Sequence, residues 1–334
     1  MTFPSIDAQA RTDAAFANYE EVSHQKGISP LTEILPMVTG IPPDYMHLVC
    51  LGVVRRIMHI WFVSGSSTGR RLPFSKRQIA SDLHVKLFSH LPREFKRKGR
   101  PLSEMEYYKA TEFRTFLLYL SPLVMKNVLT EQQYKYAMLL HCAIYLLCTD
   151  AYKHYLAVCE SLLKRFVAQF KDLYGFDQMV YNIHVLTHLV SAAKYYGQLD
   201  SWSAFPFENH LRKLKNAVRS PNKPLVQIVN RIKEVGIHER IPPYRILEYK
   251  TSSPDNVILT VHGIIMANSF SEASGNCTGY LLALVKPIYD YPYPSSNFNV
   301  GIYRKTNIII SSTIKIKCVS YPMNDGTFGI IQMT

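Results

Sequence analysis

Two short stretches, far apart in the chain, hold the residues best suited to chemistry. Asp44 and His47 stand three residues apart, directly after Gly40-Ile-Pro-Pro, in a helix-like run that continues to Trp61. An imidazole at this spacing can orient or polarise the carboxylate. The simpler interpretation makes Asp44 an N-cap that accepts backbone N–H bonds and complements the helix dipole. The second stretch contains a single carboxylate, Glu208, at the start of a basic helix.

The helix that Glu208 begins carries a basic stripe. Arg212, Lys215 and Arg219 follow the carboxylate at i+4, i+7 and i+11, with Lys213 beside them. Next to the stripe lies an apolar face made of Phe207, Leu211, Leu214 and Val218. Such a stripe can follow DNA phosphates beside an active-site acid. Spacing alone favours a plainer interpretation, in which Glu208 pairs with Arg212 at the start of the helix.

A second basic cluster runs from Arg93 to Arg100 and has five positive side chains in eight residues. Lys96, Arg97 and Lys98 form its centre. A cluster of this kind can bind nucleic acid or act as a nuclear localisation signal. A solvated loop between two helices explains it equally well.

The remaining histidines and the cysteines point to packing more than to chemistry. His184 and His188 stand at i and i+4, where two imidazoles share one helical face and could bridge a metal ion. The intervening residues do not complete an H-E-x-x-H pattern, so a packed helix with hydrogen-bonded histidines is favoured. His59 is interpreted in the same way. The six cysteines form no C-x-x-C pair, which indicates buried free thiols in a reducing compartment.

Hydrophobic periodicity and turn residues predict a helical chain that ends in strands. The expected helices cover residues 8–22, 75–91, 103–119, 130–149, 151–173, 177–195, 207–218 and 225–235. The expected strands cover residues 257–261, 280–285, 301–303, 313–321 and 327–333. Asn324-Asp-Gly-Thr is typical of a hairpin turn between the last two strands.

Length and charge limit the possible functions. The chain has 334 residues and a formal net charge of +13, which suits a folded protein with a polyanionic partner. Its longest apolar run is too short to span a membrane, and the first residues lack the pattern of a secretory signal. We therefore expect a nuclear or cytoplasmic protein without a membrane partner. A homo-oligomer is compatible with the sequence.

Three blocks together resemble the later blocks of CACTA-like and KDZ-type (Kyakuja-Dileera-Zisupton) DDE transposases. The blocks run from Ile41 to Arg56, from Tyr181 to Leu189 and from Ser203 to Lys215. The resemblance implies an RNase H-like core in which carboxylates hold Mg²⁺ ions for DNA cleavage and strand transfer. It makes Glu208 the final catalytic and metal-binding acid, and Asp44 with His47 an accessory D-x-x-H motif.

The resemblance also implies a particular fold. It is mainly α within the α+β class: a partial RNase H-like core with a large all-α insertion, followed by a small β-rich C-terminal domain. The expected divisions are residues 1–40 as an N-terminal remnant and loop, 41–240 as the transposase-like helical region, and 241–334 as the β-rich domain.

The first two catalytic aspartates of such an enzyme would lie upstream, and neither Asp7 nor Asp13 stands in an apolar strand pattern. A single Glu cannot hold two divalent ions, so Mg²⁺ is expected only where a complete active site is assembled. The favoured hypothesis is a domesticated or truncated, DNA-binding relative of these transposases without independent strand-transfer activity. One alternative is a non-enzymatic helical module that contacts RNA, chromatin or an acidic protein. A metal-dependent phosphohydrolase that uses Asp44, His47, His184 and His188 is a weaker one.

Overall fold

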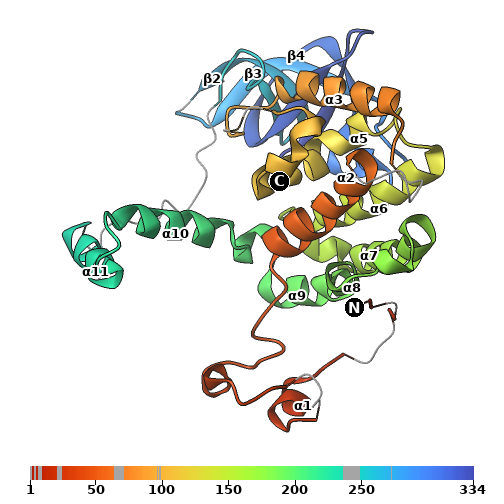
Figure 1. The fold of residues 1–334 in the computed structure, drawn as a ribbon. Helices are drawn as coiled ribbons and strands as arrows, with labels where there is room; N and C mark the ends of the chain where they lie inside the picture. Colours follow the sequence, from red (N-terminus) through yellow and green to blue (C-terminus); the bar gives the residue numbers. More distant parts are fainter. Residues whose placement is uncertain are drawn as a thin grey trace.

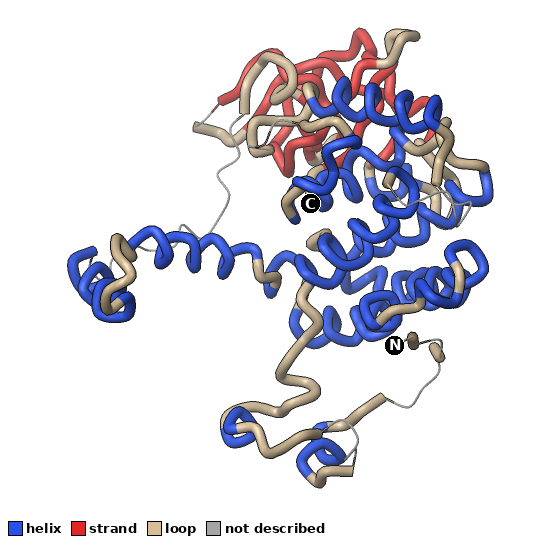
Figure 2. The backbone as a smooth tube through the Cα atoms, viewed as in Figure 1, coloured by secondary structure: helices blue, strands red, loops and turns tan. Residues whose placement is uncertain are grey.

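A computed structural model describes residues 2–3, 5–6, 10–20, 25–63, 71–95, 97, 99–235, 249–271 and 273–334. A helical body is followed in sequence by an antiparallel sheet that packs at one end of it (Figure 1). Colouring by secondary structure separates the two regions clearly (Figure 2). The predicted mixture of helices followed by strands is therefore confirmed.

The helical elements fall near the predicted ranges. They are α1 (Asp13–Ala17), η1 (Pro30–Glu33), η2 (Met46–Val54), α2 (Arg55–Phe62), α3 (Phe74–Phe88), η4 (Leu102–Tyr107), α4 (Ala110–Thr115), η5 (Phe116–Leu120), α5 (Ser121–Val124), α6 (Glu131–Leu147), α7 (Tyr152–Tyr174), η6 (Phe176–Gln178), α8 (Tyr181–Val185), η7 (Leu186–His188), α9 (Leu189–Tyr196), η8 (Leu199–Trp202), α10 (Phe205–Ala217) and α11 (Pro224–Val235). Two predicted helices, 103–119 and 177–195, are broken into shorter pieces. Within the described residues, the predicted helix 8–22 is reduced to α1.

Helices α6 and α7 pack together in the core of the body, and local sequence sets the start of α6 and the end of α7. Thr130 and Gln133 form a capping box at the start of α6, in which Thr130 Oγ1 accepts from the Gln133 backbone N–H at 3.3 Å. Gly175 ends α7 with a φ of 92°, a conformation that side chains disfavour. Between the two helices, Tyr136 and Phe166 stack with ring centroids 4.7 Å apart.

The helix after Asp44 is π-helical over its first half. Helical spacing predicts a buried face of Leu48, Leu51, Val54, Ile57 and Met58; all are buried except Leu51, which is half-buried. Gly52 lets this segment approach α8 closely, because a Cβ atom there would lie 2.5 Å from Asn182 Nδ2. Single π-helical turns are rare and are frequent at functional sites.

The C-terminal strands close on themselves. They are β1 (Val257–Thr260), β2 (Gly263–Ser271), β3 (Asn276–Pro287), β4 (Val300–Pro322) and β5 (Thr327–Gln332). All pairings are antiparallel; β1 pairs with both β2 and β4, and β5 pairs with the two ends of β4. The prediction omitted β2 and divided β4 in two. The predicted hairpin turn is confirmed, with Gly326 at a φ of 75° between β4 and β5.

The sheet and the body share one hydrophobic core. Tyr289, Val319 and Ile331 of the C-terminal region are buried in the same cluster as the residues of α6 and α7. Lys317 of β4 is fully buried, and its ammonium lies 2.8 Å from Glu94 Oε1 and 3.1 Å from Asp255 Oδ1. The predicted domain boundary at 240/241 falls outside the described residues and stays a prediction.

The described chain before β1 contains no strand, so the predicted partial RNase H-like core is not confirmed. The sheet that is present is antiparallel and comes entirely after the helices. Among the described helices, none is long and apolar enough to cross a membrane. All six cysteines are buried free thiols, as their apolar surroundings predict.

Candidate functional site

Asp44, His47 and Glu208 come together although more than a hundred and fifty residues separate the two motifs. His47 Nδ1 lies 2.7 Å from Asp44 Oδ2, and His47 Nε2 lies 3.6 Å from Glu208 Oε1. The imidazole therefore stands between the two carboxylates. The side chains of His47 and Glu208 are each 55% exposed, so this site is open to solvent.

Asp44 uses both carboxylate oxygens to position backbone and imidazole. Its Oδ2 also accepts from the His47 backbone N–H at 2.7 Å, which is the N-cap role expected from its position. Its Oδ1 accepts from the Ala204 backbone N–H at 2.6 Å, directly before α10. One side chain thus links the start of the η2 helix to the start of α10.

Packing beneath the junction fixes the direction of α10. The buried Tyr45 ring meets Phe205 edge-on, with centroids 6.3 Å apart. In the preceding turn, Asp200 Oδ2 accepts from Arg114 Nη2 at 2.5 Å, and the two side chains are partly buried. Burial raises the pKa of the nearby Cys50 thiol to about 12, so this cysteine stays protonated and does not supply a nucleophile.

The predicted basic stripe lies on a helix that projects from the body (Figure 1). No residue of α10 is buried, and Arg212, Lys213 and Lys215 are exposed along it; α10 ends at Ala217, so the exposed Arg219 lies in the turn after the helix and not on the predicted stripe. Glu208 faces His47, and Arg212 is not among its described ion-pair partners. The plainer interpretation of Glu208 as the partner of Arg212 is therefore not supported.

The second basic cluster is partly engaged within the protein. Arg93 Nε lies 3.3 Å from Asp255 Oδ2. Arg100 makes a two-pronged contact with the buried Glu112, at 3.1 and 2.9 Å. Arg97 is exposed, whereas Lys96 and Lys98 lie outside the described residues. The proposed nucleic-acid role of the cluster stays a prediction.

The other histidine pair is close but isolated from the junction. His184 Nε2 and His188 Nε2 are 3.4 Å apart. Burial and the neighbouring His184 lower the pKa of His188, which favours its neutral form. Over the described ranges, no three His, Cys, Asp or Glu side chains are placed to hold a metal ion. The phosphohydrolase alternative, which needs both pairs in one site, gains no support.

The residues at the junction do not fit a two-metal Mg²⁺ centre. Such a centre needs several carboxylate oxygens around two closely spaced ions. The oxygens of Asp44 accept hydrogen bonds from three N–H groups, which leaves Glu208 as the carboxylate free of such bonds among the described residues of the junction. The arrangement instead links His47 to both carboxylates and fixes the start of α10 against the body.

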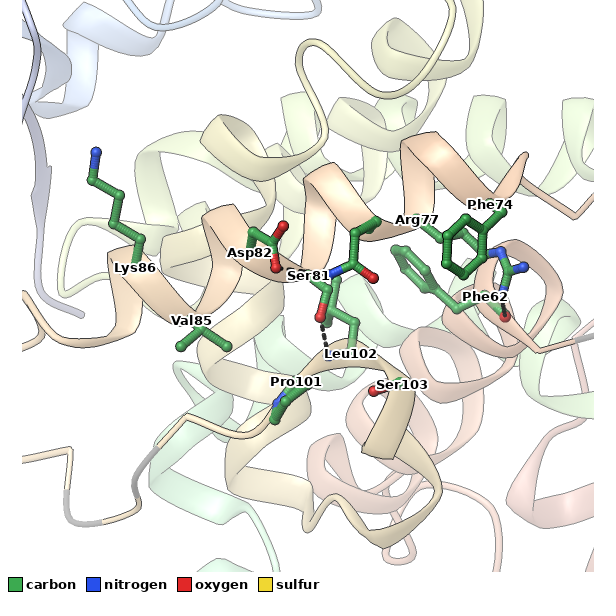
Figure 3. Close-up of a pocket in the computed structure, with 11 residues that line it drawn as sticks. Phe62, Phe74, Arg77, Ser81, Asp82, Val85, Lys86, Pro101, Leu102 and Ser103 are labelled. Atoms are coloured by element: carbon green, nitrogen blue, oxygen red, sulfur yellow. Dashed lines mark hydrogen bonds between the residues drawn. The ribbon is translucent and has the colours of Figure 1, made fainter.

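A cavity that the sequence did not indicate lies between α3 and η4 (Figure 3). It measures about 630 Å³ and is lined by apolar side chains that include Phe62, Phe74 and Leu102. Arg77 on its wall donates to the Leu72 and Phe62 carbonyls, and Ser81 Oγ accepts from the Leu102 backbone N–H. Arg77 and Ser81 hold the wall of the cavity together, and Gln78, Asp82, Lys86 and Ser103 add further polar side chains to its lining.

No family model, curated protein or solved structure matches this chain. Its function has to be argued from the geometry of its own residues.

Proposed function

We propose that this chain is a transposase-derived DNA-binding protein that does not carry out strand transfer on its own. The observation behind the proposal is the meeting of Asp44 and His47 with Glu208, since these are the residues that the D-x-x-H motif and the block from Ser203 to Lys215, with its Phe205-Pro-Phe-Glu208, single out. The finer proposal is that the region descends from an RNase H-like nuclease with a helical insertion.

DNA is the partner that best suits the charge next to the junction. Arg212 and Lys215 are exposed on α10, whose other end is fixed by Asp44, and Arg219 is exposed in the turn that follows it. Positive side chains along one face of a projecting helix can neutralise successive phosphates without reading sequence. The net charge of +13 adds long-range attraction to any polyanion.

The binding test uses labelled duplex DNA and a charge-matched control. Replacing Arg212, Lys215 and Arg219 by Ala together should weaken binding at least about tenfold, which corresponds to about 1.4 kcal/mol. The control removes three exposed lysines from α7 instead: Lys153, Lys164 and Lys171. If both triple variants bind equally well, the α10 stripe is not the DNA-binding surface.

The catalytic half of the proposal has its own test. Supercoiled plasmid incubated with this chain and Mg²⁺ should stay uncut, because the junction lacks the carboxylates for two ions. Nicking that disappears in Glu208→Gln would contradict this expectation.

A further inference from the structure

Residues 205–235 form a helical arm, made of α10 and α11, that extends away from the body (Figures 1 and 2). On α11, Leu225, Val229 and Ile232 are separated by four and three residues and share one face. They are 76%, 48% and 51% exposed, and the neighbouring Val226 is 52% exposed. A row of large aliphatic side chains left in solvent marks an interaction surface.

The surface is held in shape by its own turn. Gln227 Oε1 accepts from the Arg219 backbone N–H at 2.8 Å, and Gln227 Nε2 donates to the Ser220 carbonyl at 3.0 Å. The same amide also donates to the Asn222 carbonyl at 2.5 Å. These bonds attach the turn to α11, so that a partner would find the apolar row already in place and lose less entropy on binding.

The charge around the row selects the kind of partner. Residues 205–235 contain seven Lys and Arg against two Glu, a net of five positive charges. Of the two acids, Glu208 faces His47 and Glu234 pairs with Arg231. Lys233 follows Val229 by one helical turn, at the edge of the row. A partner therefore needs apolar side chains together with negative charge.

Two other possible partners for the apolar row, a second copy of the chain and duplex DNA, fit less well. A second copy of the arm would bring five positive charges against five, and like charges across an interface are unfavourable. Duplex DNA would satisfy the charges but offers little apolar surface to four aliphatic side chains. Neither objection applies to a helix that is apolar on one face and acidic beside it.

We infer that α11 is a docking site for an acidic amphipathic helix of a partner protein. Apolar residues of the partner at helical spacing pack on Leu225, Val229 and Ile232, and its Asp or Glu side chains meet Lys233 at the edge of this row. This is recognition of a helix by an apolar surface with complementary charge at its rim. The inference does not depend on DNA binding, which uses the basic stripe of α10.

The test uses the full chain and a labelled synthetic helix with Leu at matching spacing and Glu beside it. The peptide should bind, and versions with Lys for Glu or with scrambled Leu positions should not. Val229→Asp should weaken binding at least about tenfold. The matched control is Asn230→Asp, which adds the same charge to an exposed position off the row.

The outcomes separate the possible occupants. Equal peptide binding by Val229→Asp and Asn230→Asp would overturn the inference, as would binding of the scrambled peptide. A dimer in sedimentation that Val229→Asp dissociates would instead assign the row to a second copy. Weakened duplex DNA binding by Val229→Asp would assign it to DNA. The expected result is unchanged DNA binding by Val229→Asp and unchanged peptide binding when Arg212, Lys215 and Arg219 are replaced.

Discussion

Asp44 is the residue on which the geometry of the junction depends. Its carboxylate caps one helix, orients the His47 ring and holds the backbone before α10 through a contact with Ala204. Glu208, in contrast, contributes one longer contact of 3.6 Å and is 55% exposed. The two acids of the predicted site therefore have unequal structural roles.

Replacing Asp44 by Ala should lower the free energy of unfolding by about 1–2 kcal/mol, the usual cost of losing a helix cap, and loosen the start of α10. Chemical denaturation and amide hydrogen exchange measure the two effects. Glu208→Gln serves as the comparison and should change stability by less than about 0.5 kcal/mol, because exposed ion pairs contribute little. Similar losses in both variants would mean that Asp44 does not hold the junction.

Two buried histidines make the fold sensitive to acid. Burial lowers the pKa of His84 and of His141 from 6.5 to about 4. Because the Leu117 carbonyl can only accept, His141 Nδ1 donates to it. An unfolded chain takes up these two protons below about pH 6.5, whereas the folded protein takes them up only near pH 4.

The free energy of unfolding should therefore fall as the pH drops through this window, by on the order of 3 kcal/mol for each histidine. His84→Gln and His141→Gln should each make the free energy of unfolding depend less on pH in this range, while replacing the exposed His154 by Gln should leave this pH dependence unchanged. Denaturation curves across the window measure the slope. An unchanged slope in both buried-site variants would contradict the assignment.

At the scale of elements, the close contact between η2 and α8 depends on a missing side chain. A Cβ on Gly52 would lie 2.5 Å from Asn182 Nδ2 and 3.0 Å from the His47 carbonyl. Gly52→Ala should cost about 1–3 kcal/mol, as overpacking does. In an Asn182→Ala background that cost should shrink, because the main obstacle is gone.

Gly27→Ala is the control, since nothing lies within 4 Å of a Cβ there. Thermal or chemical denaturation of the single and double variants measures the energetic coupling between Gly52 and Asn182. If Gly52→Ala costs the same in both backgrounds, the helices are not limited by this contact.

The ends of helices could be predicted from the sequence where capping residues or glycines set them. The capping box at Thr130 and the glycine at 175 set α6 and α7 within a residue or two of the prediction. The prediction was less accurate where tertiary packing decides. The helix predicted over 103–119 divides at a 3₁₀ turn and a π-helical turn, and β2, with polar Asn268 and Ser269 inside it, carries a weak strand pattern.

The candidate site was predictable in its residues and not in its geometry. The chain itself shows Asp44 beside His47 and Glu208 before a basic helix, but spacing along the sequence cannot bring the two motifs together. The contact of Asp44 with the Ala204 backbone N–H belongs to the folded chain and leaves no pattern in residue types. The exposure of α11 is likewise a property of the whole fold.

At the scale of the molecule, one buried cation joins the sheet to the helical body. Lys317 lies between Glu94, in the segment that joins α3 to η4, and Asp255, which precedes β1. Removing one member of a buried ionic cluster commonly costs about 3–5 kcal/mol, because the remaining charges stay in the protein interior.

Lys317→Met should therefore destabilise the protein strongly, and Lys315→Met, two residues away and exposed, should have little effect. Urea denaturation of the two variants provides the comparison. Similar midpoints would show that the cluster does not join the two regions.

Charge is also distributed unevenly over the molecule: residues 205–235 carry five of the thirteen net positive charges. This concentration on a projecting arm, next to the junction of Asp44, His47 and Glu208, is the physical basis of the proposed DNA binding.

The salt dependence of duplex DNA binding tests that proposal most directly, because the slope of log affinity against log salt concentration counts the phosphates that are neutralised. Replacing Arg212, Lys215 and Arg219 by Ala should reduce the magnitude of the slope by roughly 2.7, at about 0.9 for each lost contact, and the α7 control should keep the wild-type slope. Equal slopes for the two variants, or affinity that does not change with salt, would contradict the account.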